Sequence, residues 1–565
     1  MELQWVLQQN NNSNEISQLA NQLHVPDIIA NILLNKGIDS LDKAKYFFRA
    51  SFEDLHDPYE FHQMEKAVNR IVCAVQNREK VLIYGDYDVD GITSVSLLYM
   101  FFQSIGCDVT FYIPNRLVEG YGISDTGIQD AYQKGVTLLI SVDCGITAID
   151  EVNAANELGI DIIISDHHEP GAQLPSAYAI INPKCDEANY PFHELAGVGV
   201  AYKLLQAISR HLKIDEQETL GYLDLVAIGS AADIVPLVDE NRILMREGLR
   251  LINDTNRIGL QALMETAGIQ NKQIGTGQIV FMLAPRINAV GRLGNAERAV
   301  RLLTTTNETQ ARNIAKILES ENRTRKNIDE TTFKEALEMV ESHYDIHENK
   351  ALVLDSEGWH SGVIGIVASR IVEKYYRPTV MITIEDGVGK GSARSISGFD
   401  IYSALSKCAD LLLGFGGHKY AAGLTIDKDK IDALRERLNE IANDELNDDQ
   451  LIPKLYIDDE IELTAIDSKL MTLLKMMAPY GPQNMRPVFL SRNLQVIGSP
   501  YIVGKNHLKF KVRQNGKVID AIGFNLGDKL YRISPGEQNL DIVYIIEENE
   551  YMGRTTLQLR VKDLR

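Results

Sequence analysis

Acidic residues follow three separate apolar runs of this sequence. The segments KVLIYGDYDVDG, TLLISVDCG and DIIISDHHEP carry Asp86, Asp88 and Asp90; Asp143; and Asp166, His167 and His168. Carboxylates gathered within a few ångströms raise one another's pKa and repel, and a bound cation offsets that repulsion. Carboxylate and imidazole ligands suit Mn²⁺ or Mg²⁺. The pattern therefore predicts a centre that hydrolyses a phosphoester with paired metal ions, which activate a water and stabilise the attacking and leaving oxygens.

A single aspartate after a strand has a more ordinary role, because it commonly caps a helix or forms a turn. Asp90 is the acidic residue most open to that reading, since Asp90 and Gly91 form a favourable turn pair. For the other residues, the agreement between separate strand ends favours the metal site.

Five apolar runs of strand length alternate with helical patterns, which predicts a parallel, doubly wound sheet. The runs are Lys80–Tyr84, Val109–Ile113, Thr137–Val142, Asp161–Ser165 and Ala177–Ile181. In an open α/β sheet, ligands bind beyond the carboxyl ends of the strands. The acidic residues stand at those ends, so we expect them to converge although they lie far apart in sequence.

The chain of 565 residues is too long for one hydrophobic core. Its periodicity predicts a helical segment over 1–60, a parallel α/β domain over 61–305, a connecting helix over 306–348, a smaller α/β domain over 349–443 and an all-β, OB-like module over 451–565. The polar, acidic stretch Asn443–Gln450 is predicted to be a linker before the last module.

The composition restricts partners and location. A formal net charge of −21 argues against a protein that coats duplex nucleic acid, so any contact with nucleic acid must be local. The five cysteines are scattered without a CxxC pair, which argues against a disulfide framework and a zinc ribbon. The sequence shows no signal peptide and no apolar run of about 18 residues, so we expect a cytoplasmic protein that does not enter a membrane.

Several ordered segments resemble a known family. Four of them are similar to successive motifs of the DHH phosphoesterases, namely GDYDVDG (Gly85–Gly91), SVDCG (Ser141–Gly145), DHH (Asp166–His168) and GSAADIVPL (Gly229–Leu237). Later segments resemble the RecJ single-strand exonucleases, including their DHHA1 domain, namely PRINAVGRL (Pro285–Leu293), GWHSGVIGIVASR (Gly358–Arg370), GSARS (Gly391–Ser395) and GFGGHKYAAG (Gly414–Gly423). The resemblance implies a DHH catalytic domain over 61–305, a DHHA1 domain over 349–443 and a nucleic-acid-binding OB-like module.

The same resemblance implies an activity and its partners. We expect a 5′-to-3′ exonuclease specific for single-stranded DNA that releases 5′-mononucleotides in DNA recombination and repair. The resemblance further implies a helicase and a single-strand-binding protein as partners, and a monomer. The chain ends soon after the OB-like module, so we expect it to lack the additional C-terminal partner-binding domain of some relatives.

Carried over residue by residue, the resemblance implies two cations, Mn²⁺ or Mg²⁺. Asp88, Asp143, His167 and Asp233 would surround one of them, and Asp86 with the shared Asp143 the other. His168 would contact the scissile phosphate or assist proton transfer, although an orienting role for this side chain stays open. The family often has a histidine at the position of Tyr84, so the outer cation is expected to bind more weakly here or to hold more water.

The resemblance also implies a route for the DNA strand. Arg116, Ser392 and Arg394 would form a pocket for the 5′-phosphate, because an arginine fork matches phosphate and a hydroxyl adds a donor. Three further residues, Arg286, Asn288 and Arg292, would line the path of the strand. The glycine-rich segment with Gly416, Gly417 and His418 is interpreted as a loop whose backbone amides approach phosphate closely, or as a tight turn before a packed helix.

The most basic short stretch of the chain lies in the last module. Alternation along KNHLKFKVRQNGK predicts one strand face with Lys509, Lys511 and Arg513 and an opposite apolar face. That cationic strip fits a sugar-phosphate backbone or an ordinary solvated strand face, and Tyr501 fits base stacking or packing.

Two other functions are consistent with the carboxylates. A DHH phosphodiesterase for short oligonucleotides or cyclic dinucleotides would use the same metal chemistry but needs little beyond two catalytic domains. A scaffold with a decayed site would have lost aspartates, and Asp86, Asp88, Asp143 and Asp233 are all present.

Overall fold

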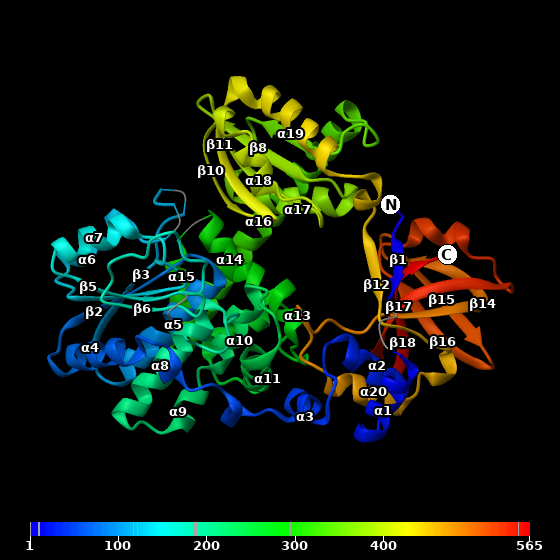
Figure 1. The fold of residues 1–565 in the computed structure, drawn as a ribbon, viewed down its shortest axis with the longest axis horizontal. Coiled ribbons are helices and arrows are strands. Elements are labelled where there is room, and N and C mark those ends of the chain that lie inside the picture. Colours follow the sequence, from blue (N-terminus) through cyan, green and yellow to red (C-terminus); the bar gives the residue numbers. More distant parts are fainter. Residues whose placement is uncertain are drawn as a thin grey trace. The chain divides into compact units, whose positions relative to one another are not determined.

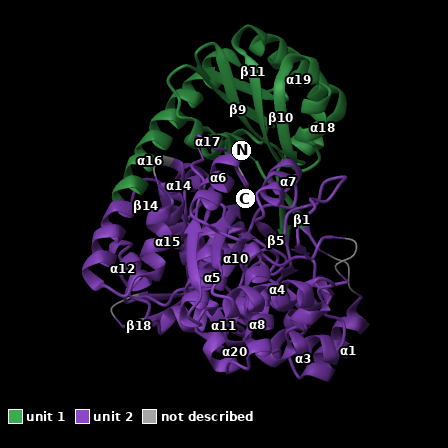
Figure 2. Cartoon of the chain, turned by 90° about the vertical axis from the view of Figure 1, so that its left-hand side faces the viewer, with its two compact units in different colours: residues 1–6, 320–456 green, residues 7–319, 457–565 purple. Residues whose placement is uncertain are grey.

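The computed structural model describes residues 2–8, 12–116, 118–120, 122–185, 189–293, 295–551 and 553–565, and the described chain forms two compact units. Residues 7–319 and 457–565 make up the larger unit, and residues 1–6 and 320–456 the smaller one (Figure 2). Within the described residues, no helix combines the length and the apolar character that crossing a membrane requires.

The larger unit contains the predicted parallel sheet, with strand order β3-β2-β4-β5-β6 (Figure 1). All five predicted strands are present, as β2 Lys80–Gly85, β3 Asp108–Tyr112, β4 Leu138–Val142, β5 Asp161–Ser165 and β6 Ala179–Ile181. Every neighbouring pair in this sheet is parallel. The predicted α/β fold is therefore confirmed for this part of the chain.

Helices cover both faces of this sheet because successive strand residues alternate between them. Val81 and Ile83 pack in one core with the helices of one face, which are α4 Met64–Gln76, α5 Val89–Ser104 and α8 Gly197–Leu212. Leu82 and Tyr84 belong to a second core under the helices of the other face, α6 Asp125–Gln133 and α7 Ile149–Glu157.

A helical region follows the sheet, as expected. It comprises α9 Glu216–Leu220, α10 Leu223–Ala232, α11 Asp239–Asn253, α12 Ile258–Thr266, α13 Thr276–Gln278, a π-helical turn η3 Ile279–Leu283, α14 Ala284–Leu293 and α15 Glu297–Thr304. The charged connecting helix is a single element of 36 residues, α16 Glu308–His343.

The smaller unit holds a second sheet with strand order β10-β11-β9-β8-β7. Its elements are β7 Leu352–Ser356, α17 Ser361–Tyr375, β8 Thr379–Glu385, β9 Val388–Arg394, α18 Ile401–Ser406, β10 Leu412–His418, β11 Ala421–Asp427 and α19 Ile431–Glu445. The glycine-rich segment is not a loop, because β10 and β11 form an antiparallel hairpin. The predicted acidic linker is also wrong as a linker: α19 extends to Glu445, and Leu446 and Leu451 are buried in the core of this sheet.

The last module is a small barrel, as predicted. Its strands are β13 Asp459–Glu460, β14 Phe489–Val503, β15 His507–Gln514, β16 Lys517–Gly523, β17 Gln538–Tyr551 and β18 Arg554–Leu564. They follow the order β13-β14-β15-β16-β18-β17, and pairing of β14 with β17 closes the sheet. Closure removes most exposed strand edges.

The first residues of the chain differ from a purely helical segment. They begin with a strand, β1 Gln4–Leu7, which pairs with β12 Lys454–Ile457, and continue with α1 Ser13–Leu23, α2 Asp27–Asn35 and α3 Leu41–Arg49. Apolar residues of these helices, such as Leu19 and Leu33, share one core with Leu474 of α20 Ser468–Met476 and with barrel residues such as Phe510. The two ends of the chain therefore fold together, a long-range contact that local periodicity does not reveal.

A buried ion pair joins α8 to α11 in the larger unit. Lys203 and Glu240 are fully buried and in contact, and Glu240 also accepts hydrogen bonds from the Tyr190 hydroxyl (2.6 Å) and from the His56 backbone N–H (3.0 Å). Burial lowers the pKa of Lys203 while the Glu240 carboxylate opposes that shift. The charges are thus tolerated only as a pair.

We expect Glu240→Gln to lower the free energy of unfolding by about 3 to 5 kcal/mol, because it leaves the buried Lys203 ammonium without its countercharge, with the His56 carbonyl oxygen (2.8 Å) as a remaining partner. The measurement is the urea midpoint of the larger unit. Removing both charges in Lys203→Met/Glu240→Met should recover part of the loss, and the exposed Glu218→Gln should change nothing. A stable single variant would show that this pair contributes little.

Candidate metal centre

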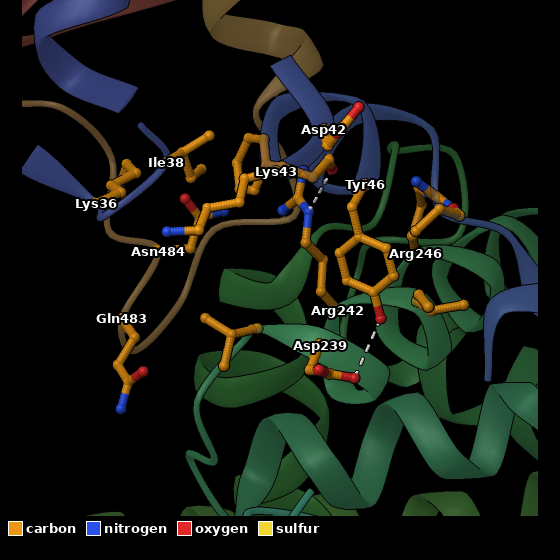
Figure 3. A pocket seen from close by; sticks show the side chains of 14 residues that line it. Lys36, Ile38, Asp42, Lys43, Tyr46, Asp239, Arg242, Arg246, Gln483 and Asn484 are labelled. Carbon is orange, nitrogen blue, oxygen red and sulfur yellow. Dashed lines mark hydrogen bonds between the residues drawn. The ribbon is translucent and has the colours of Figure 1, made fainter. Parts of the chain in front are cut away.

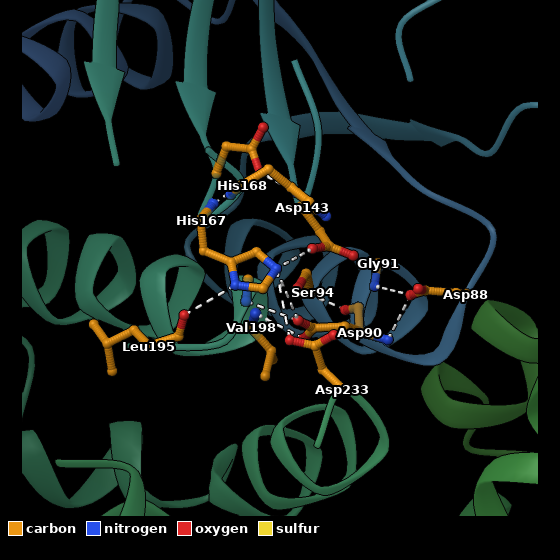
Figure 4. Close-up of polar contacts among 12 residues, drawn as sticks. Asp88, Asp90, Gly91, Ser94, Asp143, His167, His168, Leu195, Val198 and Asp233 are labelled. Carbon is orange, nitrogen blue, oxygen red and sulfur yellow. Dashed lines mark hydrogen bonds and ion pairs between the residues drawn. The ribbon is translucent and has the colours of Figure 1, made fainter. Parts of the chain in front are cut away.

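The acidic residues converge at the carboxyl edge of the first sheet, as their positions after β2, β4 and β5 predict (Figure 4). Three groups of possible ligand atoms lie within 4.8 Å of one another: Asp86, Asp88 and Asp143; Asp143, His167 and His168; and Asp90, His167 and Asp233. Asp143 belongs to two of these groups. Asp88 lies with Asp86 and Asp143, whereas the family resemblance placed it with His167 and Asp233.

His167 presents one ring nitrogen to the carboxylates. Its Nε2 lies 3.1 Å from Asp143 Oδ1 and 3.7 Å from Asp233 Oδ2. Its Nδ1 lies 3.0 Å from the carbonyl oxygen of Leu195 (Figure 4), which can accept a hydrogen bond but not donate one. The proton therefore sits on Nδ1, and the Nε2 lone pair faces the acidic cluster. Burial lowers the pKa of His167, which favours this neutral form.

The surroundings of these carboxyl groups disfavour their ionised form. Burial, and then the neighbouring carboxylates, raise the pKa of Asp143 and Asp86 well above the ordinary range. The same two causes raise the pKa of Asp90 and of Asp233 to about 7. Asp86 Oδ1 and His167 Nε2 are buried without a hydrogen-bond partner among the described residues. Oxygen and imidazole donors that repel one another fit divalent cations such as Mn²⁺ or Mg²⁺.

Asp88 has a second function at this edge of the sheet. It is the N-cap of α5, and its Oδ1 accepts hydrogen bonds from the backbone N–H groups of Asp90 (2.9 Å) and Gly91 (3.1 Å). One carboxylate oxygen thus fixes the start of the helix. This cap orients the side chain toward Asp86 and Asp143.

Asp90 is closer to the cluster than sequence reasoning expected. It lies inside α5 rather than in a turn, and it is buried. Its carboxylate accepts hydrogen bonds from the backbone N–H groups of Gly197 (2.7 Å) and Val198 (2.9 Å), which begin α8. The turn interpretation of Asp90 is therefore wrong. The sequence signal for its place in the cluster is its occurrence in one motif with Asp86 and Asp88.

Asp166 holds His168 in place. Its Oδ1 lies 2.8 Å from His168 Nδ1 and accepts hydrogen bonds from the backbone N–H groups of His167 and His168. Burial acts to raise the pKa of Asp166, but the contact with His168 leaves it lowered. Burial likewise acts against the charge on His168, whose pKa is nevertheless raised by Asp166. The sequence identifies Asp166 as an acid at a strand end, but it does not predict the contact that orients His168.

A hydrogen-bonded loop carries Arg116. The Arg116 guanidinium lies 5.2 Å from the centre of the Tyr87 ring, and its charge opposes the raised pKa of Asp86. Glu119 anchors this loop by accepting hydrogen bonds from Tyr112 Oη (2.9 Å), the Asn115 backbone N–H (2.7 Å) and Ser124 Oγ (2.6 Å). Leu117 and Tyr121, which belong to the same segment YIPNRLVEGYG (Tyr112–Gly122), lie outside the described residues.

Tyr84 does not replace a metal ligand. It is fully buried in the core on the α6 side of the sheet, and its hydroxyl donates to the carbonyl oxygen of Gly122 (3.1 Å) and accepts from the Ser124 N–H (3.1 Å). Tyr84 therefore supports the loop of Arg116 instead of facing the cations.

The three residues proposed for the strand path all lie on α14, but with different surroundings. Arg286 is buried, with Nε 2.7 Å from Glu319 Oε2, so its guanidinium is engaged within the fold. Asn288 and Arg292 are half-buried and one helical turn apart, and the positive charge of Arg292 acts on Tyr87. Gly291 allows this approach, because a Cβ there would lie 2.6 Å from the Tyr87 carbonyl oxygen.

The other proposed substrate residues lie in the smaller unit. Arg394 donates to Ser392 Oγ at 3.1 Å, and both side chains are half-buried on β9. Strand register places Ser392 opposite Gly423, and Gly423 opposite Gly416. Gly416, Gly417 and His418 are exposed on the edge strand β10. The second sheet thus gathers these residues on neighbouring strands.

Comparisons with known proteins agree with this arrangement. Family models match three segments: the DHH family N-terminal domain at residues 80–230, the DHHA1 domain at 348–444 and the RecJ OB domain at 457–563. The single-stranded-DNA-specific exonuclease RecJ of Bacillus subtilis is 39% identical over 99% of this chain and 70% of its own length. The protein of that name from Escherichia coli is 33% identical over 96% of both chains.

Solved structures agree as well. The crystal structure of RecJ in complex with Mn²⁺ from Thermus thermophilus superimposes with a TM-score of 0.85 at 28% identity, over 100% of this chain and 79% of that one. A second structure of that protein holds Mg²⁺, with a TM-score of 0.78. On these grounds the chain belongs to the RecJ family of single-stranded-DNA-specific exonucleases, within the DHH phosphoesterases.

Proposed function

We propose that this chain is a metal-dependent exonuclease that hydrolyses single-stranded DNA from its 5′ end and releases 5′-mononucleotides in recombination and repair. The observation that carries the proposal is the cluster of carboxylates, of which Asp86, Asp90 and Asp143 are buried, with one neutral imidazole at the edge of the first sheet. Membership of the RecJ family supplies the substrate class.

The cluster would hold two cations, Mn²⁺ or Mg²⁺. Asp143 and Asp233, which both face His167 Nε2, would hold one together with that imidazole. Asp86, Asp88 and Asp143 would hold the other, so Asp143 would bridge them. Bound cations of this kind activate a water and stabilise the attacking and leaving oxygens of the phosphodiester.

The remaining side chains would position the substrate. Asp166 orients the His168 ring and supports its positive charge, so this imidazole would contact the scissile phosphate or pass a proton to the leaving oxygen. Arg116, on the loop anchored by Glu119, with Ser392 and Arg394, would bind the 5′-phosphate. Asn288 and Arg292 would follow the strand, with Arg286 as support for α14; Gly416, Gly417 and His418 would offer donors along β10.

The barrel favours a long polymer over a short oligonucleotide. On β15, the side chains of Leu508, Phe510 and Val512 are buried. Those of Lys511 and Arg513 are exposed, and that of Lys509 is half-buried. Tyr501 is 51% exposed and lies opposite Lys509 on the neighbouring strand. A cationic strip beside an aromatic ring is the combination that binds single strands with little sequence preference.

Location and partners are part of the same proposal. The five cysteines are free thiols, which suits the reducing cytoplasm. We propose that the enzyme acts there as a monomer, with a helicase and a single-strand-binding protein that expose its substrate.

Asp143→Asn should lower hydrolysis of single-stranded DNA by at least about a hundredfold, because the proposed bridging carboxylate positions both cations. The measurement is turnover on end-labelled DNA across a Mn²⁺ titration, with the exposed Asp150→Asn as the matched control. Wild-type turnover of Asp143→Asn would remove this residue from the centre.

Metal binding should stabilise the protein more at about pH 7.5 than at about pH 5.5. Asp90 and Asp233 have a pKa of about 7 in the folded protein against 3.8 ordinarily. Without metal, these two groups therefore favour the folded protein at low pH, and that stability is lost as pH rises toward 7. Cations relieve that loss. Melting temperatures with Mn²⁺ and with EDTA at the two pH values test this; an equal shift at both would contradict it.

Arg394→Ala should reduce the preference for a 5′-phosphate over a 5′-hydroxyl end by about ten- to a hundredfold, the effect of one charge-assisted contact. Hydroxyl-ended DNA is the internal control, and Lys390→Ala, an exposed residue of the same strand, is the matched variant. An equal fall on both ends would show that Arg394 supports the fold or the general strand path.

The triple variant Lys509→Ala/Lys511→Ala/Arg513→Ala should weaken binding of long single strands while hydrolysis of a dinucleotide is retained. Each lost phosphate contact should also reduce the salt dependence of binding, by a slope of about 0.7. Substitution is preferred to deletion of 451–565, since deletion would expose the core that the barrel shares with α1 to α3. Equal losses on both substrates would make the strip a structural feature.

A further inference from the structure

A cavity of the larger unit lies among residues that do not belong to the metal centre. It has a volume of about 430 Å³, within the range of small-molecule sites. Its walls come from the end of α2, from α3, from the start of α11 and from the segment before β14 (Figure 3). Apolar and aromatic side chains provide much of this wall, namely Ile38, Tyr46, Phe47, Ala50, Val238 and Ile243.

Positive charge predominates in the cavity wall. Four of its side chains are cationic, Lys36, Lys43, Arg242 and Arg246, whereas two are acidic, Asp42 and Asp239. Both acids are already engaged: Asp239 accepts a hydrogen bond from the Tyr46 hydroxyl (3.1 Å), drawn in Figure 3, and Asp42 lies 3.7 Å from Lys45. Two of the cations are paired as well, Lys43 with Asp39 (2.9 Å) and Arg246 with Glu247 (3.2 Å). Among the described residues, Lys36 and Arg242 are the cations of the wall that have no carboxylate within ion-pair distance.

Arg242 contributes a buried charge that no carboxylate neutralises. It is 5% exposed, and its guanidinium donates to the carbonyl oxygens of Phe47 (3.0 Å), Met477 (3.1 Å) and Ala478 (3.1 Å). Carbonyl dipoles satisfy its N–H groups but leave the charge. Among the described residues, no carboxylate lies within ion-pair distance of it, and burial followed by the charge of Arg246 lowers its pKa to about 10.

Two neighbouring polar groups complete the wall. The Lys36 ammonium donates to the carbonyl oxygen of Met485 (3.1 Å), and burial lowers its pKa against the attraction of Asp458. Asn484 is 1% exposed, and its Oδ1 has no hydrogen-bond partner among the described residues. A buried acceptor of this kind calls for a donor from a bound molecule.

We propose that this cavity binds a nucleoside monophosphate at a site separate from the metal centre. The phosphate matches the cationic wall at Lys36 and Arg242, the base matches the aromatic surface of Tyr46 and Phe47, and a base N–H group matches Asn484 Oδ1. The volume of the cavity suits a small molecule. Mononucleotides are also the class of product that the proposed reaction releases.

The test is equilibrium dialysis of radiolabelled dAMP against the full-length protein in EDTA, so binding is read without metal and without hydrolysis. Deoxyadenosine and inorganic phosphate are measured alongside, and we expect dAMP to bind more tightly than either. Lys36→Glu should weaken dAMP binding at least about tenfold, the loss of one charge-assisted contact. DNA hydrolysis should be unchanged in this variant.

Matched variants distinguish binding in this cavity from a general effect of surface charge. Arg49→Glu makes the same charge change on α3 outside the cavity wall and should leave binding intact, and Gln483→Glu, at an exposed position of the wall, replaces Lys36→Glu if that variant fails to fold. The proposal is overturned if dAMP does not bind, if Lys36→Glu binds it normally, or if Arg49→Glu weakens it equally. It is also overturned if Asp143→Asn abolishes binding, or if an acidic peptide binds in place of dAMP.

Discussion

Carboxylates buried at the carboxyl edge of the first sheet repel one another, and the surrounding structure has to hold them together. Asp86 and Asp143 are almost fully buried, and each is surrounded by other acids whose charge raises its pKa. In the absence of cations such an arrangement opposes folding. The cluster thus destabilises the fold, but it gives a site whose geometry is set before substrate and metal bind.

Very close backbone packing holds the repelling groups in place. A Cβ on Gly91 would lie 2.4 Å from the carbonyl oxygen of Asp86, and one on Gly197 would lie 2.5 Å from Asp143 Oδ1. The Asp90 carboxylate ties α5 to the start of α8 by accepting hydrogen bonds from two backbone N–H groups. Helices and strands are thereby locked around the cluster, so the carboxylates cannot move apart to relieve their repulsion.

Segments distant in sequence brace the part of the chain that follows Asp233. The Leu237 backbone N–H donates to the carbonyl oxygen of Pro482 (2.9 Å), and Gly481 packs so closely that a Cβ would lie 2.6 Å from Leu237. Arg242, five residues later, donates to the end of α3 and to the segment after α20. The barrel module and the first helices are thus structural neighbours of the helix that follows a candidate metal ligand, and the proposed nucleotide cavity lies among the same elements.

The sequence by itself determined the parts of this protein that depend on local pattern. Alternating apolar runs predicted the five parallel strands, and acids at three strand ends predicted their convergence, because the carboxyl ends of parallel strands share one edge. Only the tertiary structure decided how those side chains are used. It showed Asp90 as a buried link between helices, Arg286 as a partner of Glu319, Tyr84 as a core residue and the glycine-rich segment as a hairpin. The first three depend on contacts between residues far apart in sequence, and so does the shared core of the two chain ends, which no local periodicity encodes. The hairpin is instead a pairing of adjacent segments.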